Sequence, residues 1–271
     1  GSIPVSEEDR NIVPNRGGVL FKEFEQGDYV IGGLENWGAS GLAGAWAEEN
    51  TRESIFNAFR RKETFATSGS RILVRFFGGF DIDELSFSDE NVIKSAYETG
   101  VPMGGDIFAE KTDKAPSFLV WTQRDVNGAP LQRVQIIKGS ISRADSSPTE
   151  KVYDIACSDG LQVDPKTNRC PDNGARVDIE TCAVSQNVGS AELKAIWTDP
   201  DFNKDDSSFY YVRVLENPTC RWSTWDAIRA GFKPREDLHD TIQDRAWSSP
   251  IWYTPENAEN PPPIRINAER L

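Results

Sequence analysis

Hydrophobic and polar positions alternate along much of the chain, and the first well-defined runs predict strands. Residues 41–49 (GLAGAWAEE) are small and apolar and end in two carboxylates, which is typical of a buried strand in an α/β unit. Residues 70–80 (SRILVRFFGGF) alternate in a period of two, which predicts a second strand with Ile72, Val74 and Phe76 on one face.

The stretch between these two strands has a helical period. We predict a helix from Thr51 to Lys62, with Asn50 as its N-cap and Glu53 completing a capping box. Basic residues at its other end complement the helix dipole. The expected buried face is the apolar stripe formed by Ile55, Phe56, Ala58 and Phe59.

The longer part of the chain is β-rich. Six runs of β-branched and aromatic residues are separated by clusters of Gly, Pro, Asp and Asn, at the spacing of a β-sandwich. These runs are residues 115–125, 131–141, 150–160, 176–184, 191–199 and 208–217. Leu131 and Val134 break the strict alternation of the second run, which allows a β-bulge there.

The two ends of the chain have other patterns. Residues 1–33 contain prolines, a glycine pair and acidic clusters, which predicts an extended arm. Residues 221–231 (RWSTWDAIRAG) predict a helix with Trp222, Trp225 and Ile228 in one stripe, and the proline-rich residues 260–271 predict an extended tail.

The expected fold class is therefore α+β, in three parts. Residues 1–67 hold the arm, one strand and one helix, and residues 68–217 form a sandwich-like β domain. Residues 218–271 supply a C-terminal helix and an extended tail that packs back on the other parts.

Charge and hydropathy narrow the classes of partner. The 271 residues include 43 acidic and 30 basic side chains, which give a formal net charge of -13. Such a field repels phosphate backbones and anionic lipid headgroups, and no apolar run approaches the roughly 20 residues that cross a bilayer. We expect a globular protein with no nucleic-acid partner and no membrane partner.

Four cysteines bear on the compartment. An even number in loop-rich sequence favours disulfides and export, and the turn-forming residues 158–169 make Cys157–Cys170 with Cys182–Cys220 the preferred of three pairings. The alternative is four reduced, buried thiols in a cytoplasmic protein. His239 is the sole histidine, and no Cys-x-x-Cys pair occurs, so the spacing disfavours a zinc site.

Several blocks of the sequence carry a family resemblance. They include residues 41–80, GVPMGGDI (100–107), FYYVRVLENPTCRWSTWDA (209–227) and RAWSSPIWY (245–253). These blocks resemble the C-terminal half of the family called domain of unknown function thirty-six-oh-four, which is similar to a branch of the PHP (polymerase and histidinol phosphatase) metallohydrolases. The resemblance extends from about Gly41 to Tyr253.

The resemblance implies a metal-dependent hydrolase on a distorted (β/α) barrel, followed by a β-rich domain and often made for export. Residues 41–62 would be the last strand and helix of the barrel. The metal ligands of the family lie in His-x-His and Asp-x-His segments upstream, and His239 lies in neither kind of segment, so no ligand is transferred to this chain. The resemblance thus implies a divalent metal (Mn, Zn or Fe) only for a full-length protein, and a missing N-terminal barrel portion as partner.

Four charged residues near the predicted helix are candidates for chemistry. Glu48 and Glu49 could bind a cation or act as acid and base, although helix capping or solvation would also explain them. Arg52 and Arg71 could hold a phosphate or sulfate through forked hydrogen bonds, or simply form ion pairs with nearby acids.

Three other features are candidates for binding. Trp222 and Trp225 could stack on sugar rings, although burial of their stripe is the simpler explanation. The aspartates of residues 158–174 suggest a calcium loop but lack the EF-hand spacing, and residues 100–107 match neither a Walker loop nor a dinucleotide fingerprint.

Two functions follow from this sequence, beside the simpler alternative of a structural domain that only stabilises the barrel by covering its open flank. The first is the accessory C-terminal portion of a metal-dependent hydrolase that acts on an ester of phosphate or a related oxyanion, inactive by itself because its metal ligands lie outside the chain. The second is an exported β-sandwich module that binds a carbohydrate or a protein. A periplasmic or secreted location is expected in either case, with the cytoplasm as the alternative.

Overall fold

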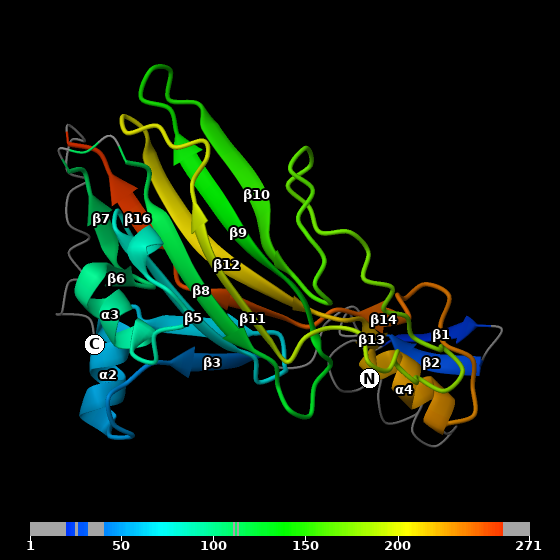
Figure 1. Ribbon diagram of the computed structural model, residues 1–271. Helices are drawn as coiled ribbons and strands as arrows, with labels where there is room; N and C mark the ends of the chain where they lie inside the picture. The colour runs from blue at the N-terminus through cyan, green and yellow to red at the C-terminus, as the bar shows by residue number, and fades with distance from the viewer. Residues whose placement is uncertain (1–19, 25–26, 32–40, 111, 113, 257–271) are drawn as a thin grey trace.

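The computed structural model describes residues 20–24, 27–31, 41–110, 112 and 114–256 (Figure 1). Their strands are mostly antiparallel and their helices few, so the predicted α+β class is confirmed at this level. The predicted extended tail lies outside the described residues.

The larger sheet has eight strands and collects segments from the whole described chain. Its main path runs through six antiparallel strands: β10 (Pro148–Cys157), β9 (Leu131–Ile141), β12 (Ser207–Glu216), β15 (Arg245–Ser248), β4 (Thr64–Thr67) and β3 (Leu42–Ala45). β16 (Ile251–Thr254) also pairs with β12, and β7 (Asp106–Phe108) runs parallel to β16. Members of the three expected parts, residues 1–67, 68–217 and 218–271, share this sheet, and the division into domains stays a prediction.

The smaller sheet has four strands in the order β11 (Glu192–Thr198), β8 (Ser117–Gln123), β5 (Leu73–Gly79) and β6 (Val101–Pro102). Side chains from both sheets meet in one hydrophobic core. β5 contributes Val74 and Phe76 to that core, which Ile72 extends just before the strand, so the predicted inner face of residues 70–80 is confirmed. Leu73, between them, is 41% exposed.

Three α-helices lie outside the sheets in the described part: α2 (Arg52–Arg60), α3 (Val92–Thr99) and α4 (Trp222–Arg229). A short 3-10 helix, η2 (Ile82–Glu84), joins α3 in covering one end of the smaller sheet, where Phe77 and Leu119 form a second small core. None of the described helices is both long and apolar enough to pass through a membrane.

Two small two-stranded sheets complete the described elements. β1 (Leu20–Phe24) pairs with β2 (Gly27–Ile31), so this part of the predicted arm is a hairpin instead of extended chain. β13 (Thr219–Cys220) pairs with β14 (Thr241–Ile242) beside α4 (Figure 1). The expected bulge in residues 131–136 is present, because the β9–β12 register shifts between Leu215 and Glu216 opposite it.

Two details of the 41–62 region differ from the predictions. The strand in 41–49 is limited to β3, which pairs only with β4 in the described residues and begins with an exposed Leu42, so it is an edge strand and not a buried one. α2 begins one residue later than predicted, because the side chain of Thr51, not Asn50, accepts the backbone N–H of Ser54. The side chain expected to bond back to a backbone N–H before the helix was that of Glu53. In the structure it is the hydroxyl of Ser54, which accepts the N–H of Glu49.

The predicted buried stripes of the two helices are confirmed only in part: Ala58 is buried, while Ile55, Trp222 and Ile228 are half-buried. In α2 the buried residues are Ser54 and Ala58, while Phe56 is 60% and Phe59 is 53% exposed. In α4 small residues face inward and Trp225 is 37% exposed.

Both preferred disulfides are present. Cys157 bonds to Cys170 and Cys182 to Cys220, each with its Cα atoms 5.6 Å apart. Since such bonds persist in oxidising compartments, the pairings favour an extracellular or periplasmic location.

Candidate functional site

A pocket of about 590 Å³ lies where the β3–α2–β4 segment meets the smaller sheet. It combines aromatic, basic and acidic side chains from several segments between residues 46 and 102. Its lining residues are Trp46, Ala47, Glu48, Arg61, Glu63, Arg75, Tyr97 and Pro102.

The end of α2 places Glu63 in this pocket. The N–H of Lys62 bonds to the carbonyl of Phe59 and the N–H of Glu63 to that of Ala58, while Lys62 adopts a φ of 59°. This is a Schellman ending, in which a left-handed residue reverses the chain just past the helix. Glu63 is therefore carried inward, directly before β4, and its side chain is only 4% exposed.

Three side chains surround the Glu63 carboxylate. The guanidinium of Arg61 lies 3.3 Å from one oxygen and that of Arg75 lies 4.0 Å from the other. The hydroxyl of Tyr97 donates a short hydrogen bond to the carboxylate. Arg61 also lies 3.5 Å from Glu48, which is largely exposed.

Arg75 is held in one orientation by two aromatic residues. Its Cζ lies 3.4 Å from the ring centroid of Trp46, and its Nη1 donates to the Tyr97 hydroxyl at 2.8 Å. Trp46 is itself fixed, because its indole N–H donates to the carbonyl of Val74 at 2.8 Å. This stacking leaves the Nε and Nη2 donors of Arg75 without a hydrogen-bond partner among the described residues.

Burial raises the pKa of the Tyr97 hydroxyl to about 12, and its hydrogen bond to Glu63 adds to the rise. The phenol is therefore neutral near pH 7 and acts as a donor. In the pocket it satisfies one oxygen of Glu63 without adding charge, while Arg61 and Arg75 keep partly exposed guanidinium edges.

Cations and indole rings alternate in a row across the outer face of the smaller sheet. Lys194 is the register partner of Trp121, and Trp121 is the partner of Arg75. The Nζ of Lys194 lies 4.0 Å from the ring centroid of Trp121, and the Trp121 indole N–H donates to Glu192. With Trp46 beyond Arg75, the row reads cation, indole, cation, indole in a chain that is acidic overall.

A second pocket of about 200 Å³ adjoins the first and shares Trp46 and Arg75 with it. Its lining residues are Trp46, Leu73, Arg75, Ile93, Trp121 and Gln123. The floor is mostly apolar, in contrast to the charged lining of the first pocket.

The structure brings only one of the four predicted charged candidates to this site. Glu48 lines the pocket, although it lies in the loop after β3 and not at the end of the strand. Glu49, Arg52 and Arg71 are exposed, and the two arginine side chains form no ion pair in the described part of the chain. The backbone N–H of Arg71 instead donates to Asp125.

The residues that dominate the site were not among the sequence candidates. Glu63, Tyr97 and Arg75 come from a helix end, another helix and a strand, and no local motif links them. One signal was available: Arg75 stands among apolar neighbours in residues 72–77, where a charge is unusual.

Trp225 lies at a different place. It lines a pocket of about 650 Å³ beside the Cys182–Cys220 disulfide, together with polar residues such as Asn127 and Asn187. The Cζ of Arg229 lies 5.3 Å from its ring centroid.

The donors of the described residues do not fit a transition metal. No group of three or more His, Cys, Asp or Glu side chains there is arranged to hold an ion, and all four cysteines are in disulfides. His239 lines a polar pocket with Asp172 and Arg176, but Asp172 is paired with Arg176 at 2.7 Å. The described residues therefore do not fit the metal that the family resemblance implies.

The three aspartates of the candidate calcium loop each bind a different partner. Asp159 accepts the N–H of Gly189, Asp164 accepts that of Lys166, and Asp172 binds Arg176. Each carboxylate thus has its own hydrogen-bond or ion-pair partner, and the three partners lie in different segments.

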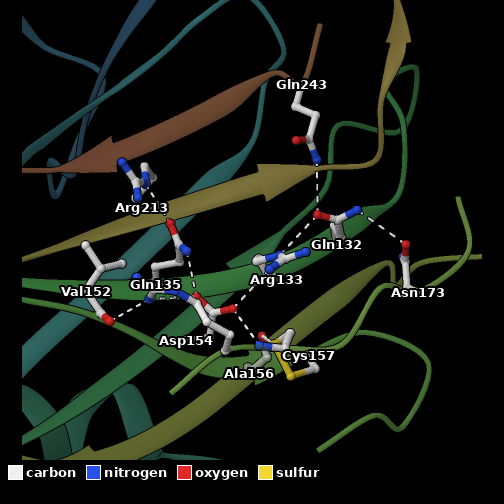
Figure 2. A network of polar contacts seen from close by, with 12 residues as sticks. Gln132, Arg133, Gln135, Val152, Asp154, Ala156, Cys157, Asn173, Arg213 and Gln243 are labelled. Atoms are coloured by element: carbon white, nitrogen blue, oxygen red, sulfur yellow. Dashed lines mark hydrogen bonds and ion pairs between the residues drawn. A yellow bond between two sulfur atoms is a disulfide. The ribbon is translucent and has the colours of Figure 1, made fainter. Parts of the chain in front are cut away.

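A polar network on β9 and β10 is structural in character (Figure 2). The fully buried Asp154 accepts hydrogen bonds from Arg133, Gln135 and the N–H of Cys170. Gln135 in turn accepts the Nε donor of Arg213. These bonds tie the Cys157–Cys170 loop to the sheet and satisfy the buried charge, so the network serves packing.

Comparison with known proteins gives one family. A family model described as "Protein of unknown function (DUF3604)" matches residues 14–255. No curated protein matches the chain. No solved structure matches it either.

Proposed function

Because the chain belongs to the family described as protein of unknown function (DUF3604), we propose its function from its own site and from the resemblance to PHP metallohydrolases. The proposal is an accessory, substrate-binding portion of a metal-dependent hydrolase that acts on an ester of phosphate or a related oxyanion. The observation that carries it is the convergence of Arg61 and Arg75 on one pocket.

The two guanidiniums suit a tetrahedral oxyanion. Each presents N–H donors in a planar fork, and Arg75 is oriented in advance by Trp46 and Tyr97. Glu63 is buried behind them and its charge is offset by its partners. Glu48 is the exposed, 3.5 Å partner of Arg61, so an incoming anion would displace it at little cost.

The proposed reaction is a hydrolysis. A water oxygen bonds to the phosphorus or equivalent centre, the bond to the leaving oxygen breaks, and a proton from water ends on the leaving alcohol. The metal and its ligands would belong to the N-terminal barrel portion of the family, outside this chain. The residues of this chain would bind and orient the oxyanion.

The exposed face of α2 supports the accessory role. Phe56 and Phe59 form an apolar patch on the same segment that contributes Arg61 to the pocket. A helix that closed the proposed barrel would present such a face to it. The two disulfides support a periplasmic or secreted location over the cytoplasmic alternative.

The proposal is tested with the purified chain in two measurements. Isothermal titration with inorganic phosphate and sulfate should show binding that Arg61→Gln and Arg75→Gln each weaken, while Arg52→Gln leaves it unchanged. An assay with manganese, zinc or iron and generic phosphoesters should show no turnover by the chain alone. Turnover that survives purification, or oxyanion binding indifferent to Arg75, contradicts the proposal.

A second candidate function rests on Trp225. Its exposed indole beside the amides of Asn127 and Asn187 has the composition of a carbohydrate-binding surface. The chain would then be an exported binding module. Retention on a polysaccharide column that Trp225→Ala abolishes would favour this function over the first. Trp252→Ala is the matched control, because Trp252 is also exposed and does not line this pocket.

A further inference from the structure

The apolar pocket beside Arg75 has a shape and lining that the oxyanion role does not use. Leu73 and Ile93 form aliphatic walls, and the indoles of Trp46 and Trp121 face the same space. Leu73 is 41% exposed there, on a strand whose neighbouring side chains are fully buried. Two aliphatic and two indole side chains grouped around one recess form an apolar surface of the kind that receives an apolar group.

The pocket adjoins the oxyanion site across two shared lining residues, Trp46 and Arg75. Arg75 lines both pockets, and its Nε and Nη2 donors have no partner among the described residues. A ligand whose oxyanion contacts Arg75 therefore has its organic group beside this pocket. Cross-strand pairing of Arg75 with Trp121 fixes that distance, because both residues belong to rigid strands of one sheet.

The lining discriminates between classes of organic group. A sugar ring would bring several hydroxyls, and burial of a hydroxyl without a partner costs about 1–3 kcal/mol. Apart from Arg75 the pocket offers one polar side chain that could satisfy them, Gln123. A flat apolar ring needs no such partner. The pocket has a volume of about 200 Å³, which exceeds the roughly 150 Å³ in which an apolar protein cavity holds benzene.

We propose that the oxyanion ester bound at this site carries an aryl or similar flat apolar group, which enters the pocket between Leu73, Ile93 and Trp121 while its oxyanion contacts Arg75. This inference rests on the proposed oxyanion-binding role and specifies the substrate class for it. The tetrahedral oxyanion is shared by phosphate and sulfate esters.

The test is isothermal titration of the whole chain with four probes: inorganic phosphate, methyl phosphate, phenyl phosphate and glucose 6-phosphate. Phenyl phosphate should bind about tenfold more tightly than methyl phosphate, and glucose 6-phosphate no more tightly than methyl phosphate. Phenyl sulfate, titrated in parallel, distinguishes the two oxyanions.

Two variants locate the organic group. Leu73→Gln should reduce the preference for phenyl over methyl phosphate by about threefold or more, and Gln123→Leu should increase it. Ile141→Gln is the matched control, because Ile141 is also an exposed aliphatic residue of a strand, at the end of β9 and outside this pocket. Leu73, Gln123 and Ile141 are all exposed, and circular dichroism checks that each variant is folded.

The outcomes separate the two proposals. Arg75-dependent binding of phosphate with no preference for phenyl phosphate overturns the aryl inference and leaves the oxyanion role standing. A preference for glucose 6-phosphate, or an equal effect of Leu73→Gln and Ile141→Gln, also overturns it. Failure of every probe to bind in an Arg75-dependent manner removes the oxyanion role itself.

Discussion

The guanidinium of Arg75 lies flat against the indole of Trp46, with 3.4 Å between its Cζ and the ring centroid. The two residues belong to segments 29 positions apart, yet the pair forms the wall shared by both candidate pockets. A planar cation in this position is oriented before any ligand arrives, which lowers the entropy that binding must overcome.

Arg75→Lys is therefore expected to weaken phosphate binding by about tenfold although the charge is kept. A lysine ammonium cannot stack as a plane on Trp46 or offer two parallel donors. The measurement is isothermal titration with inorganic phosphate. Arg71→Lys is the control, since the side chain of Arg71 is exposed and unpaired in the described part, and equal affinities of the two variants would refute the role of stacking.

Lys62→Gly is expected to raise the free energy of unfolding by about 1 kcal/mol. Lys62 has a φ of 59° at the Schellman position of α2, where a side chain is disfavoured and glycine is not. Urea denaturation measures the change.

Gly104→Ala is expected to have the opposite effect on stability, at a glycine that packs against Lys62. Gly104 has a φ of 87°, and a Cβ there would stand 2.3 Å from the carbonyl oxygen of Lys62. We expect this substitution to destabilise the protein by about 1–3 kcal/mol. If Lys62→Gly lowers stability as much as Gly104→Ala, the assignment of the helix ending is wrong.

Glu216→Gln is expected to remove a pH dependence of stability. Glu216 is 1% exposed, and burial raises its pKa to about 7, with a further rise from the nearby carboxylate of Asp244. The folded state then holds a proton between about pH 4.5 and pH 7 that the unfolded chain has released, so the free energy of unfolding falls as pH rises through this window. The penalty above pH 7 is on the order of 3 kcal/mol.

The variant should thus be more stable than the natural sequence at pH 8 and nearly equal to it at pH 4.5. Thermal unfolding at a series of pH values provides the measurement, with Glu150→Gln as the control because Glu150 is exposed. An unchanged pH profile in Glu216→Gln would show that another group causes the dependence.

Loss of either disulfide is expected to destabilise the protein, and the two losses should differ in size. The Cys157–Cys170 bridge spans 13 residues and the Cys182–Cys220 bridge 38, so loop entropy alone predicts about 3 and about 4 kcal/mol. The measurement is denaturant unfolding of the two paired Cys→Ser variants.

A thiol titration of the denatured, non-reduced protein is the complementary experiment. It should find no free thiol, since no cysteine in the described chain is unpaired. Four reactive thiols would contradict both the bridges and the inferred oxidising compartment.

The sequence by itself predicted the strand at residues 70–80, five of the six later β runs and the preferred disulfide pairing. Residues 176–184 were expected as a strand but contain only an isolated bridge between Val177 and Val184. Alternation in residues 72–76 placed Ile72, Val74 and Phe76 inside because side chains in a strand point to opposite faces, which is a local property. The Cys157–Cys170 bridge followed from a turn-forming loop of short span, which is also local.

Only the tertiary structure decided which helix faces are buried and where the site lies. Phe56 and Phe59 have the periodicity of a core stripe, but the fold buries Ser54 and Ala58 of this helix and leaves both phenylalanines exposed, so tertiary placement overrides the pattern. The cluster of Glu63, Arg75 and Tyr97 depends on a helix reversal and on strand pairing between remote segments. No spacing within the chain encodes such contacts, because the distances are set by the fold and not by the sequence separation.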